Sequence, residues 1–319
     1  MIRWCCRLML AGCVLLCLDA SLFAQSKLRI AVIPKGTTHI YWKSVEAGAR
    51  AAGTDLDVDI VWKGPVKEND RAQQISIVEQ FVNEGVAGIV LAPLDDVALE
   101  RPVRSAKARK IPVVIFDSAL KGTPGKDFVS FVATNNRNGG DLGGESLASL
   151  LDGKGGVVLL RYMVGSASTR EREEGFLQAI ARHEELNVLV SNRFAGPTAG
   201  EAKAASMNMI DKLKECDGIF CPNESSTFGM LLALRQNNLA GKKKFVGFDT
   251  SPPLIEGLEH GEIDALVAQD PTRMGYEAVK TLVDHIRGKQ VPARIDTQVR
   301  LITRDNLHDP SIKKLLGTP

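Results

Sequence analysis

The chain has 319 residues, enough for about two domains that each bury a core of their own. Hydrophobic residues make up 44% of the chain and charged residues 24%, which are ordinary values for a globular protein. The formal net charge is +2, from 40 basic and 38 acidic residues, so the charge balance gives no reason to expect nucleic acid or an anionic membrane as a partner.

Residues 1–24 have the pattern of a secretory signal peptide. Arg3 and Arg7 precede an apolar stretch from Leu8 to Leu18, and a short segment then ends at Ala24. The stretch is shorter than the roughly 20 apolar residues that a membrane-spanning helix needs. We therefore predict export, cleavage after Ala24 and a mature chain in the periplasm.

A lipoprotein signal is a second interpretation of this leader. Residues 10–13 read Leu-Ala-Gly-Cys, which matches a lipobox and would leave Cys13 lipidated. A lipobox normally closes the apolar stretch, whereas here the stretch continues through Val14 and Leu16. Release into the periplasm is the leading prediction, and a lipid anchor on Cys13 stays open.

The mature chain keeps only two of the six cysteines, Cys216 and Cys221. Export permits a disulfide. On an extended path, however, five residues separate the two Cα atoms by roughly 16 Å, which is beyond disulfide reach. We predict two reduced, buried thiols.

From Lys27 onward, short apolar runs alternate with helical patterns. Helices are predicted, for example, at 45–52, 73–84, 172–182 and 226–236. Strands are predicted at 28–33, 58–62, 87–91, 112–116 and 128–132, and in a second series at 156–160, 187–191, 217–221, 244–248 and 264–268. This alternation is typical of parallel βαβ units in an α/β protein.

The two series are about equally long, which predicts two similar doubly wound parallel-sheet lobes with a ligand cleft between them. The N-terminal lobe is expected to contain residues 27–134 and 270–297, and the C-terminal lobe residues 135–269 and 298–319. The chain would then cross between the lobes near 134–136, 269–270 and 298–301, which together would form a hinge.

Several predicted strands end at a polar side chain. Asp117, Asn223, Asp249 and Gln269 each follow a short apolar run. Ligands of open α/β sheets bind outside the carboxyl ends of the strands, so we expect these side chains to converge on one crevice. Two carboxylates and two carboxamides suit a neutral, polyhydroxylated molecule.

Motifs for catalysis or for a cofactor are absent from the sequence. It contains neither the Gly-x4-Gly-Lys-Ser/Thr phosphate loop nor a Gly-x-Ser-x-Gly elbow, and its glycine pairs at 139–140 and 143–144 fall in a helical stretch. The five histidines are scattered, without the spacing of zinc ligands. The pattern favours a binding protein over an enzyme, with neither metal nor cofactor.

From Lys27 to about Thr303 the sequence resembles the periplasmic sugar-binding proteins of the ribose-binding type, the ligand receptors of ABC importers. The motifs that carry the resemblance are Ser-Thr-Arg-Glu-Arg-Glu-Glu-Gly-Phe at 168–176, Pro-Asn-Glu at 222–224, Val-Gly-Phe-Asp at 246–249 and Ala-Gln at 268–269. The resemblance implies the type 1 fold of periplasmic binding proteins. It also implies a monomer that closes on a sugar or a sugar-like polyol and delivers it to an importer permease and its ATPase.

Site roles follow from the resemblance. It implies that Asp117 and Arg172 bind sugar hydroxyls, that Asn223, Asp249 and Gln269 make further polar contacts, and that Tyr41, Trp42 and Phe248 cover the faces of the sugar ring. Planar groups with two hydrogen-bonding atoms suit the hydroxyl edge of a sugar, and aromatic rings suit its C–H faces.

Three of these residues have a purely structural alternative. Arg172 stands in a charged segment that also fits a solvated helix start. Asp249 fits the N-cap of a helix that begins at Pro252. Trp42 fits a place under the first helix, beside Val45.

The segment after the first strand departs from the ribose-binding pattern. It reads Pro-Lys-Gly-Thr-Thr-His at 34–39, so Lys35 and His39 stand where small polar residues are expected, and Ala92 replaces a polar contact. Another sugar, a polyol, an anionic sugar or the furanosyl signal autoinducer-2 therefore stay open as ligands. Lys35 also fits a place on the cleft rim, in water.

Two other functions use the same fold. A sensor that presents its bound sugar to a chemoreceptor or a histidine kinase cannot be separated from an importer component on this sequence. A transcriptional repressor needs a basic DNA-binding headpiece of roughly 60 residues. The residues before the first predicted strand are too few and too apolar for one, so we expect no nucleic acid partner.

Overall fold

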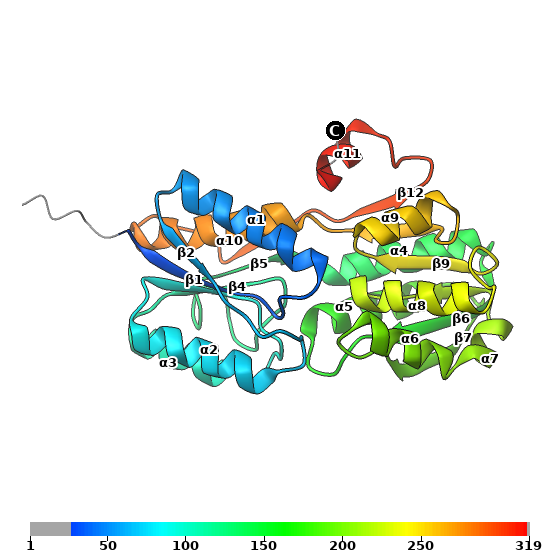
Figure 1. Ribbon diagram of the computed structural model, residues 1–319, viewed down its shortest axis with the longest axis horizontal. Coiled ribbons are helices and arrows are strands. Elements are labelled where there is room, and N and C mark those ends of the chain that lie inside the picture. The colour runs from blue at the N-terminus through cyan, green and yellow to red at the C-terminus, as the bar shows by residue number, and fades with distance from the viewer. Residues whose placement is uncertain (1–26, 318–319) are drawn as a thin grey trace, which may run out of the picture.

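The computed structural model describes residues 27–317 of the chain. They form two α/β lobes that lie end to end, the N-terminal lobe in blue and cyan and the C-terminal lobe in green and yellow (Figure 1). The predicted leader, its cleavage site and Cys13 lie outside the described residues. Within residues 27–317, no helix combines the length and the hydropathy needed to cross a membrane.

The N-terminal lobe is built on a six-stranded sheet. Its strand pairs are all parallel. In order across the sheet, the strands are β11 (Arg294–Thr297), β5 (Ser130–Thr134), β4 (Val113–Phe116), β3 (Gly88–Leu91), β1 (Arg29–Ile33) and β2 (Asp59–Trp62).

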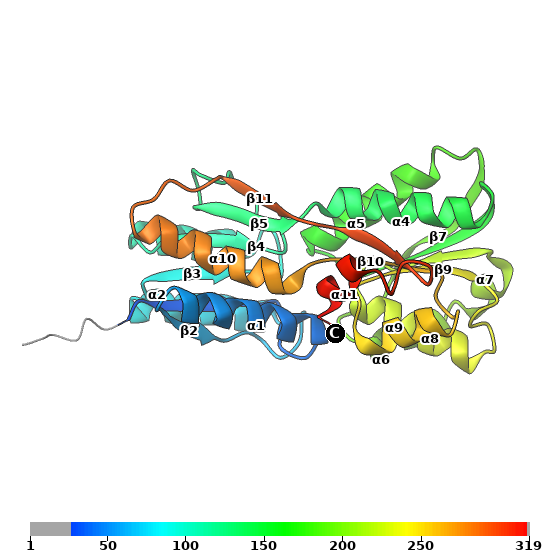
Figure 2. The same ribbon diagram turned by 90° about the horizontal axis from the view of Figure 1, so that it is seen from above.

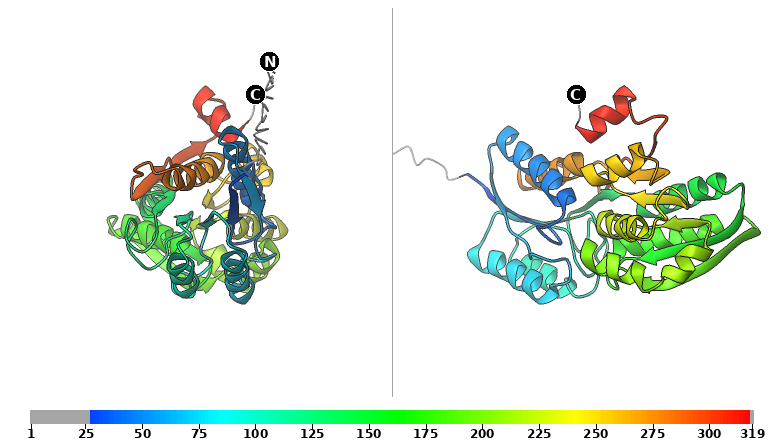
Figure 3. Two further views of the ribbon diagram at one scale, coloured as in Figure 1. Left: turned by 90° about the vertical axis from the view of Figure 1, so that its left-hand side faces the viewer. Right: turned by 45° about the vertical axis from the view of Figure 1, so that its right-hand side comes forward.

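Helices cover both faces of this sheet, and the end-on view shows the two layers (Figure 3). One face packs against α1 (Ile40–Asp55) and α10 (Pro271–Ile286), the other against α2 (Arg71–Glu84) and α3 (Glu100–Ala108). Local sequence sets the ends of α2: the Asp70 side chain accepts a hydrogen bond from the Gln73 N–H, and Gly85 ends the helix in the left-handed conformation.

The C-terminal lobe repeats this plan. In order across its sheet, the strands are β12 (Arg300–Thr303), β10 (Ala265–Ala268), β9 (Lys244–Phe248), β8 (Gly218–Phe220), β6 (Lys154–Arg161) and β7 (Glu185–Phe194). The pairs are parallel except that β12 runs antiparallel to β10.

Two helix layers also enclose the second sheet. One face packs against α4 (Asn136–Leu150) and α5 (Ala167–Ile180). The other face carries α6 (Ala199–Met207), α7 (Ile210–Glu215), α8 (Glu224–Gln236), α9 (Pro252–Glu259) and α11 (Pro310–Leu316).

The chain passes between the sheets three times, because β5 is followed by α4, β10 by α10, and β11 by β12. Viewed from above, α10 runs beside α1 in the N-terminal lobe, and the segment from β11 continues into the C-terminal lobe (Figure 2). The predicted fold class, two similar doubly wound lobes joined by several crossovers, is confirmed.

Cys216 and Cys221 are free and buried, as predicted, and burial raises the pKa of the Cys216 thiol to about 11.

The strands β11 and β12 were not predicted. Each has only four residues, begins with arginine and ends with threonine, so neither shows the apolar run that marks the central strands.

Candidate ligand-binding site

Asp117 and Asp249 occupy equivalent places in the two lobes. Asp117 follows β4 and Asp249 follows β9, and their backbones have the left-handed φ angles 60° and 73°. Their N–H groups donate to the carbonyls of Val132 and Val267 on the neighbouring strands, at 3.0 and 2.9 Å. A non-glycine residue adopts such a φ at some cost, and aspartate tolerates it better than most residues. Both carboxylates are buried between the lobes.

A cluster of polar groups surrounds Asp117. The Tyr41 hydroxyl donates to Asp117 Oδ1 at 2.8 Å, and Lys35 Nζ lies 3.1 Å from Oδ2. Lys35 also donates to Ser168 Oγ at 2.9 Å and to Ser166 Oγ at 3.3 Å, both in the C-terminal lobe. Its side chain is 4% exposed, so the alternative of a solvated rim position for Lys35 does not hold.

Tyr41 keeps its proton in this cluster. Burial, with the Asp117 carboxylate beside it, raises the pKa of Tyr41 well above its usual value. The hydroxyl is therefore a fixed donor to Asp117.

The Asp249 carboxylate is held by groups from two segments. Gln269 Nε2 donates to Oδ1 at 2.7 Å, and the Glu224 N–H donates to Oδ2 at 2.8 Å. Gln269 Oε1 accepts from Thr134 Oγ1 at 2.8 Å, which joins two of the crossovers. Burial raises the pKa of Asp249 while Arg172 opposes that rise. The N-cap of α9 is Ser251, so the alternative that Asp249 caps the helix at Pro252 is wrong.

Arg172 is buried rather than solvated, with 3% of its surface exposed. Its Nε donates to Asn136 Oδ1 at 2.8 Å, and its Nη1 donates to the Pro222 carbonyl at 2.9 Å. The guanidinium carbon lies 3.9 Å from the centre of the Phe248 ring. These contacts rule out the solvated helix start and fix the guanidinium in the cleft.

The structure places Phe248 differently from the other two predicted aromatic residues. Its ring is fully buried beneath Arg172 and does not line the cavity between the lobes. The Phe248 ring therefore offers no face on which a sugar could stack. Phe248 supports the guanidinium from below.

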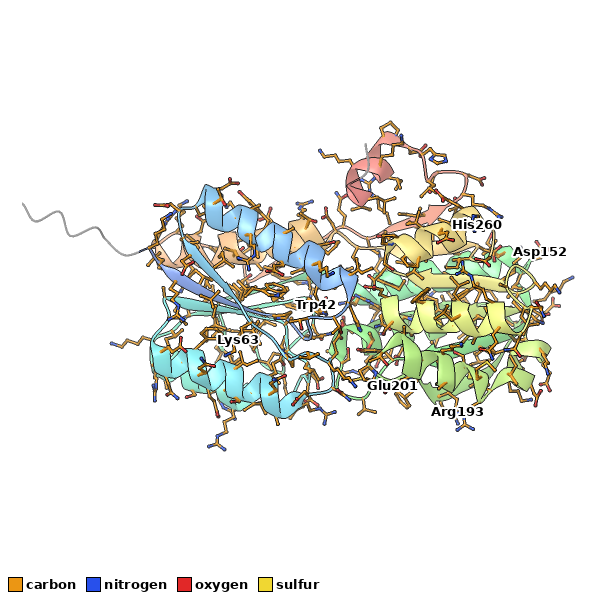
Figure 4. The ribbon with its side chains drawn as sticks, viewed as in Figure 1. Trp42, Lys63, Asp152, Arg193, Glu201 and His260 are labelled. Atoms are coloured by element: carbon orange, nitrogen blue, oxygen red, sulfur yellow. The ribbon has the colours of Figure 1, made fainter. Side chains whose placement is uncertain are left out.

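Tyr41 and Trp42 lie in the first turn of α1 and line the cavity. Trp42 is 2% exposed, contacts Tyr41 edge-on at 5.0 Å between ring centres, and donates its indole N–H to Glu68 Oε1 at 2.7 Å. Figure 4 shows Trp42 at the end of α1 that faces the C-terminal lobe, whereas Asp152 lies at the far end of the molecule. Trp42 is both a core residue and part of the cavity wall.

Asn223 performs a structural task in addition to lining the cavity. It is the N-cap of α8, and its Oδ1 accepts hydrogen bonds from the N–H and the hydroxyl of Ser226, at 3.3 and 2.6 Å. Its amide nitrogen donates to Ser225 Oγ at 3.1 Å. The amide nitrogen carries a second N–H, so Asn223 has one more donor than this bond uses.

The cavity between the lobes brings eight of the nine predicted residues together, all but Phe248. Its volume is about 30 Å³, enough for water molecules but smaller than a sugar ring. Its lining comprises Lys35, His39, Tyr41, Trp42, Glu68, Asp117, Tyr162, Ser168, Thr169, Arg172, Asn223, Glu224, Asp249 and Gln269.

The cavity wall includes residues that the sequence prediction did not assign to the site. Ser168 and Glu224 lie in motifs that were noticed, and Tyr162 follows β6, so the strand-end rule applied to it as well. Glu68 lies in the segment between β2 and α2 and carries no local signal. Its place in the wall depends on partners far away in the sequence.

A larger groove of about 730 Å³ lies at the other end of the N-terminal lobe. It is lined by residues before β3, β4 and β5, that is, at the amino ends of these strands, and by Lys107, Lys110, Lys126 and Lys289. Ligands of such sheets bind at the carboxyl ends. The cleft between the lobes is therefore the candidate site.

Comparison with known proteins decides the family. A family model described as periplasmic binding protein domain matches residues 30–290. The chain belongs to the periplasmic binding protein family. The resemblance noted in the sequence is thereby confirmed.

This periplasmic binding protein has well-covered relatives. It is 28% identical over 302 residues to the ribose import binding protein of Escherichia coli, covering 92% of this chain and 97% of that protein. It is 34% identical to a carbohydrate transporter solute binding protein from Agrobacterium radiobacter, solved in complex with D-arabinose, with a TM-score of 0.86 and coverages of 91% and 99%.

A third relative is an ABC transporter solute binding protein from Agrobacterium vitis, solved with bound D-fucose. Its TM-score is 0.86 and its identity 32%, over 89% of this chain and 98% of that one. This periplasmic binding protein is thus a solute-binding component of an ABC transport system. The prediction that it binds and does not catalyse is confirmed, since the family consists of binding proteins.

Proposed function

We propose that this periplasmic binding protein captures a neutral monosaccharide, or a polyol of similar size, and delivers it as a monomer to the permease and ATPase of an ABC importer. The observation that carries the proposal is the convergence of buried polar groups from both lobes, above all Asp117, Arg172 and Asp249. The Agrobacterium relatives, whose structures hold D-arabinose and D-fucose, support a sugar of this size.

The charges of the cavity wall support a neutral ligand. Lys35 pairs with Asp117, His39 pairs with Glu68, and Arg172 lies between aromatic and carbonyl partners. Arg172 also attracts the buried Asp249 carboxylate, which opposes the rise that burial causes in the pKa of Asp249. A buried cation and a buried anion that neutralise each other leave no net charge for a charged ligand to pair with. A ligand with neutral hydroxyl groups therefore fits this site better than a charged one.

Entry of the sugar requires the lobes to part. The cavity of about 30 Å³ is too small for a sugar ring, so the described conformation is a closed one. The three crossovers provide a hinge, and the bond between Thr134 and Gln269 ties two of them together beside the site. Hinge closure around the ligand is a known way for two-lobed proteins to bind.

A thermal-shift screen of the mature protein tests the proposal. A sugar present at 100 times its dissociation constant should stabilise the protein by about 2.7 kcal/mol, which corresponds to a shift of several degrees. The panel comprises D-ribose, D-arabinose, D-fucose, further hexoses, polyols and sugar acids. A sugar or polyol should give the largest shift. A response to sugar acids alone, or to none of these compounds, would contradict the proposal.

Replacing Lys35 by methionine should separate this site from that of a ribose-type relative. Methionine keeps most of the stem and removes the ammonium, which costs hydrogen bonds to a charged group worth about 1.5–3 kcal/mol each. We expect calorimetry to show an affinity loss of about tenfold or more for the best sugar of the screen.

The deoxy analogue that lacks the contacted hydroxyl should lose less affinity. Lys63→Met is the matched control, because Lys63 donates to Gln80 on the exposed surface of the same lobe. Equal losses for both compounds would mean that Lys35 acts only as a bridge between the lobes and does not contact the sugar.

Export is a separate expectation. Expressed with residues 1–24 in a Gram-negative host, the protein should appear in the periplasmic fraction and begin near Gln25. Mass spectrometry of the N-terminus provides the measurement. A diacylated Cys13 would replace this expectation by the lipoprotein alternative, and an intact leader in the cytoplasm would contradict both.

A further inference from the structure

Glu68 ties the two lobes together with a buried carboxylate. It lies between β2 and α2 in the N-terminal lobe and is 6% exposed. Within its own lobe it pairs with His39 Nδ1 at 2.8 Å and accepts from the Trp42 indole at 2.7 Å. From the C-terminal lobe, the Tyr162 hydroxyl donates to its second oxygen at 2.9 Å. Both carboxylate oxygens of Glu68 are therefore bound by protein groups, and these groups come from both lobes.

His39 adds a second bridge between the lobes. It stands directly before α1, and its Nε2 lies 3.0 Å from the carbonyl oxygen of Pro197, which follows β7 in the other lobe. A carboxylate and a backbone carbonyl are both acceptors, so each ring nitrogen of His39 must carry a hydrogen. A neutral imidazole has only one N–H. The closed arrangement therefore requires the doubly protonated imidazolium.

The charged surroundings of His39 favour that cation. Besides Glu68, the carboxyl group of Glu224 at the start of α8 faces the ring from the C-terminal lobe. Lys35 is a second cation that acts on Glu68, and Asp117 with two serine hydroxyls already holds it. Burial is the largest influence and opposes the charge on His39, yet Glu68, Glu224 and the Pro197 carbonyl together outweigh it, and the pKa of His39 rises to about 9.

We propose that His39, Glu68 and Tyr162 form a clasp that holds the lobes closed only when His39 is doubly protonated, so that closure takes up a proton. His39 and Glu68 are positioning residues in this proposal, because their polar atoms bind each other and the opposite lobe. The clasp concerns the closing of the lobes and does not depend on which solute is bound.

Opening of the lobes removes interactions of His39 with the C-terminal lobe, and this loss sets how closure depends on pH. When the lobes part, His39 loses the Pro197 carbonyl and the Glu224 carboxyl group, and its Nε2 meets water, which can donate to it. The closed form needs the second proton to keep both bonds of His39, whereas the open form does not, so we expect the pKa of His39 in the open form to be lower than about 9. The stabilisation of the closed form is complete at low pH and is lost as pH rises through about 9. Within that window, affinity should fall by at most about tenfold per pH unit.

Small-angle X-ray scattering from about pH 6 to about pH 10, with and without saturating D-arabinose, tests the clasp. The radius of gyration of the wild-type protein should rise with pH as the lobes open. Glu68→Gln keeps the size of the side chain but removes its charge, so the midpoint should move down toward pH 6.5. His39→Gln should abolish the midpoint. His183→Gln is the matched control, since His183 also faces a glutamate, Glu145, at 3.3 Å, but on the outer surface.

Several outcomes would overturn the clasp. One is a wild-type radius that does not change with pH in either condition. Another is a midpoint that stays in place in both Glu68→Gln and His39→Gln. If those variants do not fold, nitrogen NMR of the histidine rings in the wild-type protein decides, because a singly protonated His39 ring in the closed form at pH 7 contradicts the proposal. A midpoint seen without D-arabinose supports the clasp whether or not that sugar binds.

Discussion

Replacing Asp249 by alanine is expected to lower the affinity for the sugar at least tenfold while the fold survives. The carboxylate accepts hydrogen bonds from Gln269 and from the Glu224 N–H inside the closed cleft. Without it, those donors and the sugar hydroxyls lose their acceptor, at a cost of about 1–3 kcal/mol for each buried group left unpaired. Asp249 follows the end of β9 and packs into neither core, so unfolding should stay cooperative.

Calorimetry with the best sugar of the thermal-shift screen measures this effect. Asp264→Ala is the matched control. Asp264 also accepts a backbone hydrogen bond, from the Phe245 N–H at 2.9 Å, but it precedes β10 at the opposite end of the same sheet. That variant should lose stability and keep its affinity. If Asp249→Ala behaves in the same way, its carboxylate only holds the amino end of α8.

Gly140→Ala is expected to lower the free energy of unfolding by about 1–3 kcal/mol or more, as overpacking of a tight contact does. Gly140 lies in α4, where a Cβ atom would come within 1.9 Å of the Arg172 carbonyl oxygen on α5. The contact is reciprocal, because a Cβ on Gly175 of α5 would lie 2.1 Å from the Arg137 carbonyl oxygen on α4. The two helices must move apart to accept a methyl group.

This substitution should also weaken sugar binding, because it displaces the backbone of Arg172. Urea unfolding and calorimetry measure the two effects. Gly200→Ala is the control: Gly200 is an exposed helical glycine whose nearest neighbour to a new Cβ would be 3.9 Å away. It should leave stability unchanged or raise it by a few tenths of a kcal/mol. An unchanged unfolding midpoint for Gly140→Ala would show that α4 and α5 are not in tight contact in solution.

The sequence predicted much of the fold because each buried parallel strand can be recognised from a short stretch of the sequence. Runs such as Val-Val-Ile-Phe at 113–116 are apolar throughout, since helices cover both faces of the sheet. All ten predicted strands exist, with ends shifted by up to three residues. The edge strands β11 and β12 escaped prediction because each has only four residues, with a polar side chain at both ends.

Helix ends were less well predicted than strands. The helix expected at 172–182 is Ala167–Ile180, so Arg172 lies in its second turn and faces inward. The start was missed because Ser166 precedes the helix without a side-chain capping bond and the charged run 170–174 masks the apolar pattern. By contrast, the cleft is lined by Asp117, Asn223 and Gln269, as predicted. Each follows an apolar run, and the residue after a strand of a doubly wound sheet lies at the edge where ligands bind.

The sequence by itself determined the two-lobed fold and most of the cavity wall, because local apolar runs set the strands and the strand ends set the edge at which polar side chains gather. Only the tertiary structure decided the partners of those side chains. Tyr162 and Glu68 are 94 residues apart, and His39 and Pro197 are 158 apart. Such contacts depend on how the crossovers bring the lobes together. For the same reason the sequence could not reveal that Phe248 supports Arg172 from below or that Lys35 bridges Asp117 and Ser168.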